Sequence, residues 1–193
     1  KNFFLGIGHK RLTILDPTEK GKQPMISNDV IISYNGEIYN FLEIKKDLIE
    51  LGFEFKTSTD TEVVLNAYIM WGLEFLKKLN GMFAISIFDK KKNKIFLIRD
   101  RLGVKPLYWS FDNDRFFFSS ELKSYKKFFG KDFQISNIGI SNYFKYGYIP
   151  EPYSIIKSVN KLRAGHYLEF NIDKKKIFEN EYWDVNLDNT SKI

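Results

Sequence analysis

The spacing of apolar residues predicts a strand followed closely by a helix in the first quarter of the chain. Residues 30–34 form an extended apolar run, which is typical of a strand. Apolar residues then recur at helical spacing up to Gly52, a typical helix stop, at Phe41, Ile44, Leu48 and Leu51. Between the two elements lies Asn35-Gly36, a pair that usually forms a hairpin turn, yet no return strand follows. We therefore expect the strand to end in a corner at this pair.

A second helix is predicted soon after the first, with Gly72 expected to end it. Its apolar face consists of Val64, Leu65, Tyr68 and Ile69. Both helices begin with a capping-box pattern, in which a polar residue is followed three positions later by a glutamate. The two pairs are Asn40 with Glu43 and Thr59 with Glu62.

The pattern then changes to short strands that are rich in β-branched and aromatic residues. Polar turns separate the segments MFAISIFD (82–89), KIFLIRD (94–100), PLYWSF (106–111) and RFFFSS (115–120). We expect these strands to form consecutive hairpins in an antiparallel sheet, and a further strand-like segment, FFLGIG, opens the chain at 3–8. Because the helices are grouped near the middle, with strands on either side, the order of elements predicts an α+β fold with helices covering sheets.

The character of the chain shifts again near Gly130. Pro150 and Pro152 favour an extended crossing, and the residues that follow them favour a hairpin. We therefore expect a first domain over residues 1–130, and a second segment over residues 131–193 that ends this domain and leads into another.

Composition limits the functions that are compatible with this pattern. With 193 residues, 44% of them hydrophobic, the chain can bury one sizeable core. No apolar run approaches the roughly 20 residues that cross a bilayer, and the first residues lack the cleavage site of a signal peptide. We therefore expect a cytoplasmic protein with no membrane partner. Zero cysteines exclude a disulfide framework, a thiolate metal site and a cysteine nucleophile within this sequence, and we predict no metal site.

The formal net charge of +6 raises the question of nucleic-acid binding. The lysines are scattered, however, and the densest run of them, at residues 90–94, lies between two predicted strands. This position favours a solvated turn over a nucleic-acid surface, which should occupy one face or one helix. We therefore expect no nucleic-acid partner.

The Asn35-Gly36 pair is also a candidate catalytic element. Exposed backbone N–H groups there, together with the side-chain amide of Asn35, could donate to a developing oxyanion, and Gly36 would let a ligand approach closely. Glu37 could accept a hydrogen bond from an ammonium group. The alternative is an ordinary turn in which Asn35 bonds its own backbone.

Two other residues extend this pocket. Arg11 begins an apolar run, where its guanidinium could hold a carboxylate with paired hydrogen bonds. Asp60 lies at a helix start, where the alternative role is a capping or helix-dipole interaction. Together these residues would suit an amidase that acts on an amino-acid side chain. Such an enzyme needs a cation to bind the substrate carboxylate, carboxylates to bind its ammonium, and an oxyanion hole for the side-chain carbonyl. Glutamine fits that description.

Successive motifs along the chain carry a family resemblance. They are GHKRLTILD, QPM, YNGEIYN, STDTEVVLNAY, LNGMFAISIFD, IRDRLGVKPLYW and SSELKS. In this order they resemble the amino-terminal class II glutamine amidotransferase domain of glutamine-hydrolysing asparagine synthetases, over most of residues 6–130. The resemblance implies the N-terminal-nucleophile hydrolase fold, a four-layer αββα sandwich of two antiparallel sheets.

The resemblance also assigns roles to residues. It implies that Arg11 contacts the glutamine carboxylate, that Asn35 and Gly36 form the oxyanion hole, and that Glu37 and Asp60 accept from the substrate ammonium. The pocket would also be lined by Leu12, Thr13, Ile14 and Leu15. The matching cluster Arg99-Asp100-Arg101 precedes a Gly/Pro corner, where charged residues more often fix a loop than touch substrate.

Two parts of the family's machinery are missing from this sequence. The family nucleophile is a cysteine at the mature amino terminus, with its own α-amine as base, whereas this chain opens with Lys1 and has no cysteine. The Ser-Gly-Gly-x-Asp pyrophosphate loop of the synthetase domain is absent too. We therefore expect a fragment of a longer enzyme, inactive by itself, whose missing domain uses aspartate, ATP and Mg²⁺. The alternatives are a glutamine-binding or scaffold module without a nucleophile, and the same domain of an amidotransferase with another acceptor; a homodimer is left open.

Overall fold

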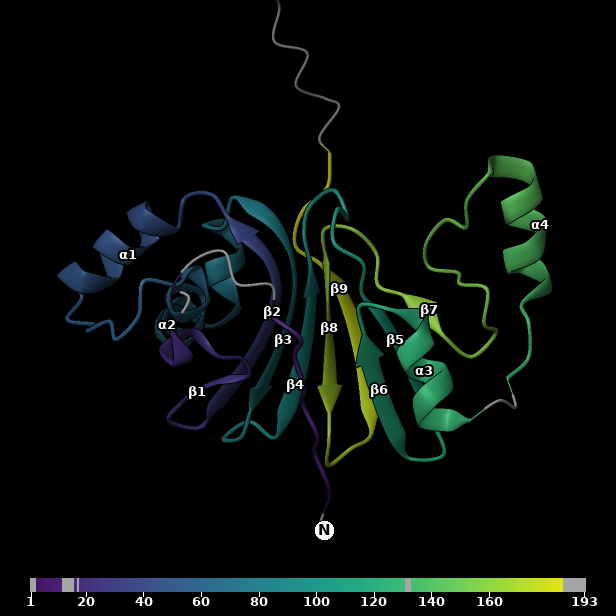
Figure 1. The fold of residues 1–193 in the computed structure, drawn as a ribbon, viewed down its shortest axis with the longest axis horizontal. Helices are drawn as coiled ribbons and strands as arrows, with labels where there is room; N and C mark the ends of the chain where they lie inside the picture. The colour runs from purple at the N-terminus through teal and green to yellow at the C-terminus, as the bar shows by residue number, and fades with distance from the viewer. Residues whose placement is uncertain (1–2, 12–15, 17, 131–132, 186–193) are drawn as a thin grey trace, which may run out of the picture.

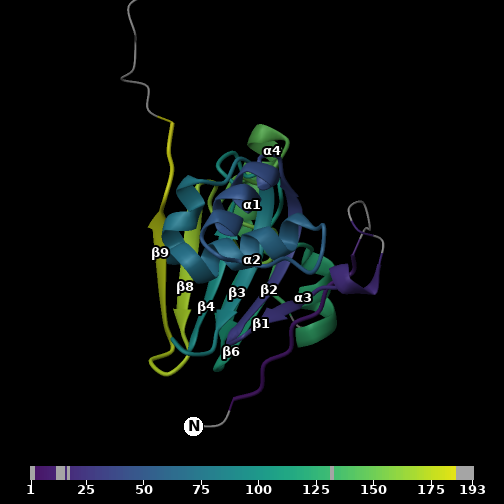
Figure 2. The same cartoon turned by 90° about the vertical axis from the view of Figure 1, so that its left-hand side faces the viewer.

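The protein folds into two antiparallel sheets that pack face to face between helices, as the views in Figure 1 and Figure 2 show. The computed structural model describes residues 3–11, 16, 18–130 and 133–185. The larger sheet has the strand order β1 (Met25–Ser27), β2 (Val30–Ile38), β3 (Gly81–Asp89), β4 (Lys94–Arg99), β8 (His166–Asn171) and β9 (Lys176–Glu181). The smaller sheet has the order β6 (Arg115–Ser119), β5 (Tyr108–Asp112) and β7 (Asn160–Lys161).

Helices cover both outer faces of this pair of sheets. On the larger sheet lie α1 (Phe41–Glu50), α2 (Asp60–Trp71) and the short 3₁₀ helix η2 (Gly72–Lys77), while η1 (Glu19–Gly21) precedes β1. On the outer face of the smaller sheet lies α3 (Leu122–Phe129), with α4 (Asn137–Tyr146) beyond it. The order helix, sheet, sheet, helix is the predicted four-layer αββα sandwich.

Alternation along the strands explains how these layers are held together. In β3, Phe83, Ile85 and Ile87 pack beneath α1 and α2, whereas Ala84 and Phe88 face the smaller sheet. Both faces of β3 are therefore buried, which is why its sequence is almost continuously apolar. β6 behaves in the same way, because Phe116 and Phe118 point toward the larger sheet and Phe117 packs against α3.

The two predicted helices are confirmed, but neither predicted capping box is complete. The Thr59 hydroxyl accepts from the Glu62 N–H at 3.3 Å, as expected for an N-cap, whereas the Glu62 carboxylate accepts from Lys56 N and Thr57 N and not from Thr59 N. The side chain of Asn40 does not cap α1; its Nδ2 donates to Lys78 O and its Oδ1 accepts from Asn80 N, both at 2.9 Å. The capping box predicted at Asn40 is therefore wrong, because distant backbone groups satisfy this amide instead.

The expected corner at Asn35-Gly36 is also wrong. β2 runs through both residues to Ile38, and Asn35 and Gly36 lie opposite Ala84 and Phe83 of β3. A Cβ on Gly36 would lie 2.1 Å from the backbone oxygen of Met82, so the glycine allows close approach of a neighbouring strand. The chain turns toward α1 only after Ile38.

Strand pairing differs from the predicted run of hairpins. The predicted strands at 82–120 all form, but β4 pairs with β8 and not with β5, so the two hairpins belong to different sheets. A hairpin does follow Pro152, as predicted, but it consists of β8 and β9, while the short strand β7 before it pairs with β5. β8 and β9 thus bring residues from the 131–193 segment into the larger sheet. The helices α3 and α4 were not predicted.

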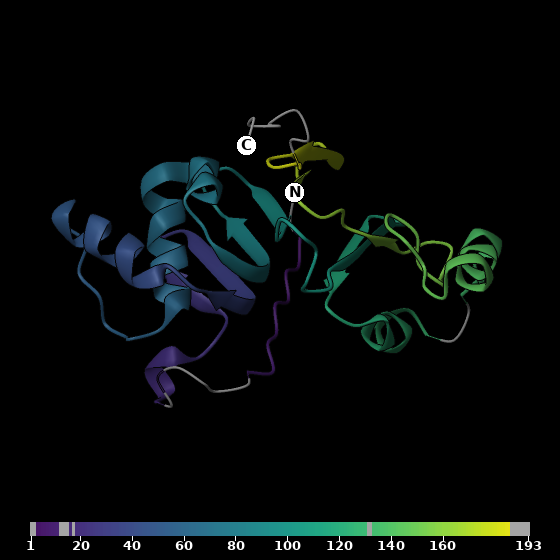
Figure 3. The same ribbon diagram turned by 90° about the horizontal axis from the view of Figure 1, so that it is seen from above.

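The opening segment forms no strand over residues 3–8. It runs between the two sheets, where Leu5 and Ile7 pack against the core that the sheets share (Figure 3). This path leads to Arg11 and toward the edge of the larger sheet. The lysine-rich run after β3 forms the turn to β4, as predicted, with Lys90, Lys91 and Lys92 exposed.

Candidate active site

A cleft of about 650 Å³ opens beside the end of β2. It is bounded by the opening segment, the start of α2, the end of β6 and the start of α3. All five predicted site residues that the structure describes line this cleft: Arg11, Asn35, Gly36, Glu37 and Asp60. The other four, Leu12, Thr13, Ile14 and Leu15, lie outside the described residues.

The free edge of β2 determines which backbone groups face the cleft. β1 pairs only with residues 30–32 of β2, so the edge is open beyond them. Tyr34 N donates to Gln23 Oε1 at 2.6 Å, and Ile38 N donates to Asp60 Oδ2 at 3.2 Å. Because alternate N–H groups of a strand point to the same edge, the N–H of Gly36 lies between these two and points the same way. The exposed donor thus comes from a strand edge and not from a corner.

The amide of Asn35 lies on the same stretch of β2. Its Nδ2 donates to the hydroxyl oxygen of Ser120, which follows β6, at 3.5 Å. An amide nitrogen carries two hydrogens, so this contact leaves the second available in the cleft.

Asp60 is anchored by two donors. It is the first residue of α2 and is buried, and its Oδ2 accepts from the Tyr34 hydroxyl at 2.8 Å as well as from Ile38 N. Thr59, and not Asp60, provides the side-chain cap of α2. Asp60 therefore does not cap α2, although it lies in the first turn of the helix, where the predicted interaction with the helix dipole is favourable.

Gln23 also links β2 to the start of α2. While its Oε1 accepts from Tyr34 N, its Nε2 donates to Thr61 Oγ1 at 3.2 Å. The QPM motif therefore holds the free edge of β2 against the start of α2. Sequence reasoning assigned no role to Gln23, and only its place in that motif could have indicated one.

Arg11 lies against η1. A Cβ on Gly21 would fall 2.7 Å from both terminal nitrogens of the guanidinium, so a larger residue there would require the Arg11 side chain to shift. Arg11 Nη2 donates to the backbone oxygen of Asp16 at 2.9 Å. The Asp16 carboxylate in turn accepts from Thr18 and from Ser58 N, and these hydrogen bonds, that of the Thr18 side chain first, lower its pKa to about 2.

His9 lies in the cleft close to Arg11 and was not predicted as a site residue. Burial lowers its pKa below 6.5, a hydrogen bond with the Tyr34 backbone opposes this, and the Arg11 charge lowers it further. The imidazole is therefore mostly neutral at pH 7. Its Nδ1 is buried with no hydrogen-bond partner among the described residues.

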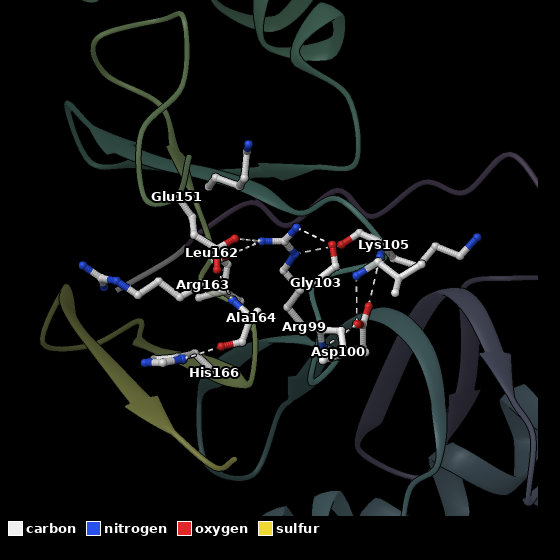
Figure 4. Close-up of polar contacts among 12 residues, drawn as sticks. Arg99, Asp100, Gly103, Lys105, Glu151, Leu162, Arg163, Ala164 and His166 are labelled. Carbon is white, nitrogen blue, oxygen red and sulfur yellow. Dashed lines mark hydrogen bonds and ion pairs between the residues drawn. The ribbon is translucent and has the colours of Figure 1, made fainter. Parts of the chain in front are cut away.

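Arg99 and Asp100 fix a loop, as predicted for the Arg99-Asp100-Arg101 cluster (Figure 4). The Arg101 guanidinium instead lies 5.9 Å from the centre of the Trp183 ring and does not line the cleft. The buried Arg99 guanidinium donates to the backbone oxygens of Gly103, Lys105 and Leu162 and to Glu151 Oε2, at 2.5–2.9 Å. The Asp100 carboxylate accepts from the backbone N–H groups of Phe83, Leu102, Val104 and Lys105. These bonds determine the path of the loop that brings Lys105 to the wall of the cleft.

The charges in the cleft suit a zwitterion. Lys10, Arg11, Lys105 and Lys123 supply cations, and Glu37, Asp60 and Glu121 supply carboxylates. The Asn35 amide and the Gly36 N–H supply neutral donors. Among the described residues, no group of three or more His, Cys, Asp or Glu is placed to hold a metal ion. Charges of both signs beside neutral donors suit the binding of an amino acid and the polarisation of a carbonyl.

The sequence profile of the glutamine amidotransferase domain matches residues 2–183. This chain belongs to that family. A Methanocaldococcus jannaschii protein named putative asparagine synthetase (glutamine-hydrolyzing) 2 is 46% identical, over 96% of this chain and 39% of its own length. Asparagine synthetase (glutamine-hydrolyzing) 3 of Bacillus subtilis is 37% identical, over 92% of this chain and 29% of its own length. The resemblance to asparagine synthetases is thus confirmed, and the amidotransferase chain spans well under half of these relatives.

Solved structures confirm the fold class. Glutamine phosphoribosylpyrophosphate amidotransferase from B. subtilis superposes with a TM-score of 0.58 at 20% identity, covering 85% of this chain and 32% of its own. A structure described as the allosteric regulatory enzyme of purine biosynthesis gives a TM-score of 0.61 at 19% identity, covering 86% and 32%. At such identities the likeness concerns the N-terminal-nucleophile hydrolase fold alone.

None of the described helices has the length and apolar character needed to span a membrane.

Proposed function

We propose that this amidotransferase domain binds L-glutamine in the cleft beside β2 and, in a longer protein, hydrolyses it to glutamate and ammonia. The observation that carries the proposal is the convergence of Arg11, Asp60 and the Asn35-Gly36 donors in one cleft. Arg11 would bind the α-carboxylate, Glu37 and Asp60 the α-ammonium. The Asn35 amide and the Gly36 N–H would donate to the oxyanion that forms when the side-chain carbonyl is attacked.

The attacking group is not among these residues. The family resemblance implies a cysteine at the mature amino terminus, with its α-amine as base, and this sequence contains no cysteine. The 193-residue chain would then bind glutamine without turning it over.

The names of the relatives suggest the fate of the ammonia. We propose that it attacks an aspartyl-adenylate formed from aspartate, ATP and Mg²⁺ in a synthetase domain, and so gives asparagine. Residues 131–193 would end the amidotransferase domain and lead into that second domain. The alternatives are an amidotransferase with another acceptor and a module that only binds glutamine.

Calorimetric titration of this chain with L-glutamine, beside an assay for ammonia, tests the proposal. We expect binding of L-glutamine, much weaker binding of D-glutamine, and no ammonia above background. An otherwise identical protein that begins with a cysteine-bearing segment should release ammonia and glutamate. No binding by the chain, or no hydrolysis by the longer protein, would contradict the corresponding half of the proposal; sustained turnover by the chain would reveal a different nucleophile.

A further inference from the structure

The hydrogen bond between Tyr34 and Asp60 joins the two elements that form the cleft. Tyr34 lies on β2 immediately before Asn35, and Asp60 begins α2. The side chains are almost completely buried, with 3% of Tyr34 and 6% of Asp60 exposed, and the hydroxyl donates to Oδ2 at 2.8 Å.

Both donors to Asp60 use the same oxygen. The Tyr34 hydroxyl and the Ile38 N–H each bond Oδ2, which leaves that oxygen with its two acceptor sites filled. Among the described residues, no donor bonds Oδ1, and Asp60 lines the cleft. Two donors to one oxygen also restrict rotation of the carboxylate, so its second oxygen is presented to a ligand with little ordering cost at binding.

We propose that Tyr34 is a positioning residue for recognition of the substrate ammonium, acting through Asp60. The inference rests on the proposed binding of glutamine in this cleft, and it adds a residue that does not itself touch the substrate. Without the hydroxyl, Asp60 would keep its charge but could rotate toward the Ile38 N–H, and its hold on the ammonium would weaken.

The hydroxyl is a dependable donor. Burial raises the pKa of Tyr34 far above its usual value, and the nearby Asp60 carboxylate raises it further through its charge and its hydrogen bond. Tyr34 therefore stays protonated throughout the physiological pH range.

The chain offers a matched control in Tyr68. It is also buried, at 2% exposed, and its hydroxyl donates to Asp89 Oδ2 at the same distance of 2.8 Å. Neither Tyr68 nor Asp89 lines the cleft. Tyr68→Phe therefore removes a buried tyrosine–aspartate hydrogen bond away from the cleft, together with an acceptor for Lys92 Nζ at 3.2 Å.

The test compares L-glutamine with 4-carbamoylbutanoate, the same molecule with hydrogen in place of the α-ammonium group. Dissociation constants for both ligands are measured by calorimetry, using direct titration or competition, on the unmodified chain, Tyr34→Phe and Tyr68→Phe. Because this chain is expected not to turn glutamine over, binding can be measured directly. The readout is the preference for L-glutamine, which is the dissociation constant of the analogue divided by that of L-glutamine.

We expect Tyr34→Phe to lower the preference for L-glutamine about tenfold, as for a lost hydrogen bond to a charged group, while affinity for the analogue changes less than about twofold. Tyr68→Phe should leave the preference unchanged. An equal loss for both ligands in Tyr34→Phe would mean a merely structural role and overturn the proposal, as would no loss at all.

Two further results keep the test decisive. If the unmodified chain binds no glutamine, the proposed function fails and this inference with it; if it binds and only the Tyr34 result is negative, this inference alone fails. If Tyr34→Phe does not fold, the hydroxyl proton of Tyr34 is followed by NMR in the unmodified chain. It should shift with L-glutamine and not with the analogue, and an equal response to both would overturn the proposal.

Discussion

The backbone oxygen of Met82 occupies the space next to Gly36 where any other residue would carry its side chain. A Cβ on Gly36 would lie 2.1 Å from that oxygen and 2.7 Å from Phe83 Cα. The backbone of β2 is equally close to Gly81 of β3, because a Cβ on Gly81 would lie 2.2 Å from Glu37 O. Two glycines on paired strands thus let β2 and β3 approach closely at the level of the cleft.

Gly36→Ala should therefore destabilise the fold. The added methyl meets backbone, which cannot rotate away, so the strands must separate. We expect a loss of about 1–3 kcal/mol in the free energy of unfolding, measured by urea denaturation. Gly8→Ala is the control, because a Cβ there meets no atom within 4 Å. Equal stability of both variants would contradict the close approach of the two strands.

Glu151→Gln should weaken the contact between the end of β4 and the extended segment that contains Pro150 and Pro152. Glu151 accepts from the buried Arg99 through Oε2, at 2.5 Å, and from Ala164 N through Oε1, at 2.9 Å. An amide can accept on one side only, so one of these donors loses its partner, and Arg99 loses its counter-charge. Because Arg99 keeps its three carbonyl acceptors, we expect a cost of about 1–3 kcal/mol.

The control for this change is Glu74→Gln. Glu74 pairs with Lys77 at 2.6 Å, and both side chains are exposed, at 71% and 70%. Exposed pairs contribute about 0–1 kcal/mol, so thermal unfolding of this variant should be nearly unchanged. A cost at Glu151 no larger than that at Glu74 would contradict the role of the buried contact.

Acid should weaken the contacts of Asp16 with Thr18 and Ser58. Its pKa in the folded protein is about 2, against 3.8 for the unperturbed group, because Thr18 and Ser58 donate to the carboxylate. A depressed folded pKa means that the unfolded state binds more protons. The contribution to stability is therefore present above about pH 4 and lost as the pH falls toward 2.

Asp16→Asn should remove this part of the pH dependence. Urea denaturation at pH 5 and at pH 2.5 should show a smaller stability difference in the variant than in the unmodified chain. Asp173→Asn, at an exposed turn, should leave the difference essentially as it is. If Asp16→Asn keeps the full difference, other carboxylates account for the acid sensitivity.

KM and kcat should distinguish the proposed roles of the cleft residues when they are measured in a longer protein that carries the nucleophile. Arg11→Ala removes a partner of a charge that is present in both the ground state and the transition state, so KM should rise with little change in kcat. Asn35→Ala removes a donor to an oxyanion that exists only after attack, so kcat should fall by about 10²–10³ with KM little changed. If Asn35→Ala raised only KM, its amide would not serve the oxyanion.

The local sequence determined the helices and most of the strands. The apolar spacing of 41–50 and 60–71, with glycine stops at Gly52 and Gly72, is a property of a few consecutive residues and needs no distant partner. The family motifs likewise identified five residues that line the cleft, because binding and catalysis require particular residue types at particular places in the motif. α3 and α4 were not predicted, although Leu122, Tyr125 and Phe129 of α3 recur at helical spacing, and α4 has a serine cap at Ser136 and a glycine stop at Gly147.

Tertiary structure decided what those residues bond. The side chain of Asn40 serves the backbone of Lys78 and Asn80, about forty positions away, and not its own helix. β4 pairs with β8 across some seventy residues, and β1 stops after three pairs, which leaves the edge of β2 open for Gln23 and Asp60. Short-range patterns fix backbone conformation because they act between neighbours in the chain. The partners of strand edges and buried polar groups depend on which distant segments pack together, and only the folded chain settles that.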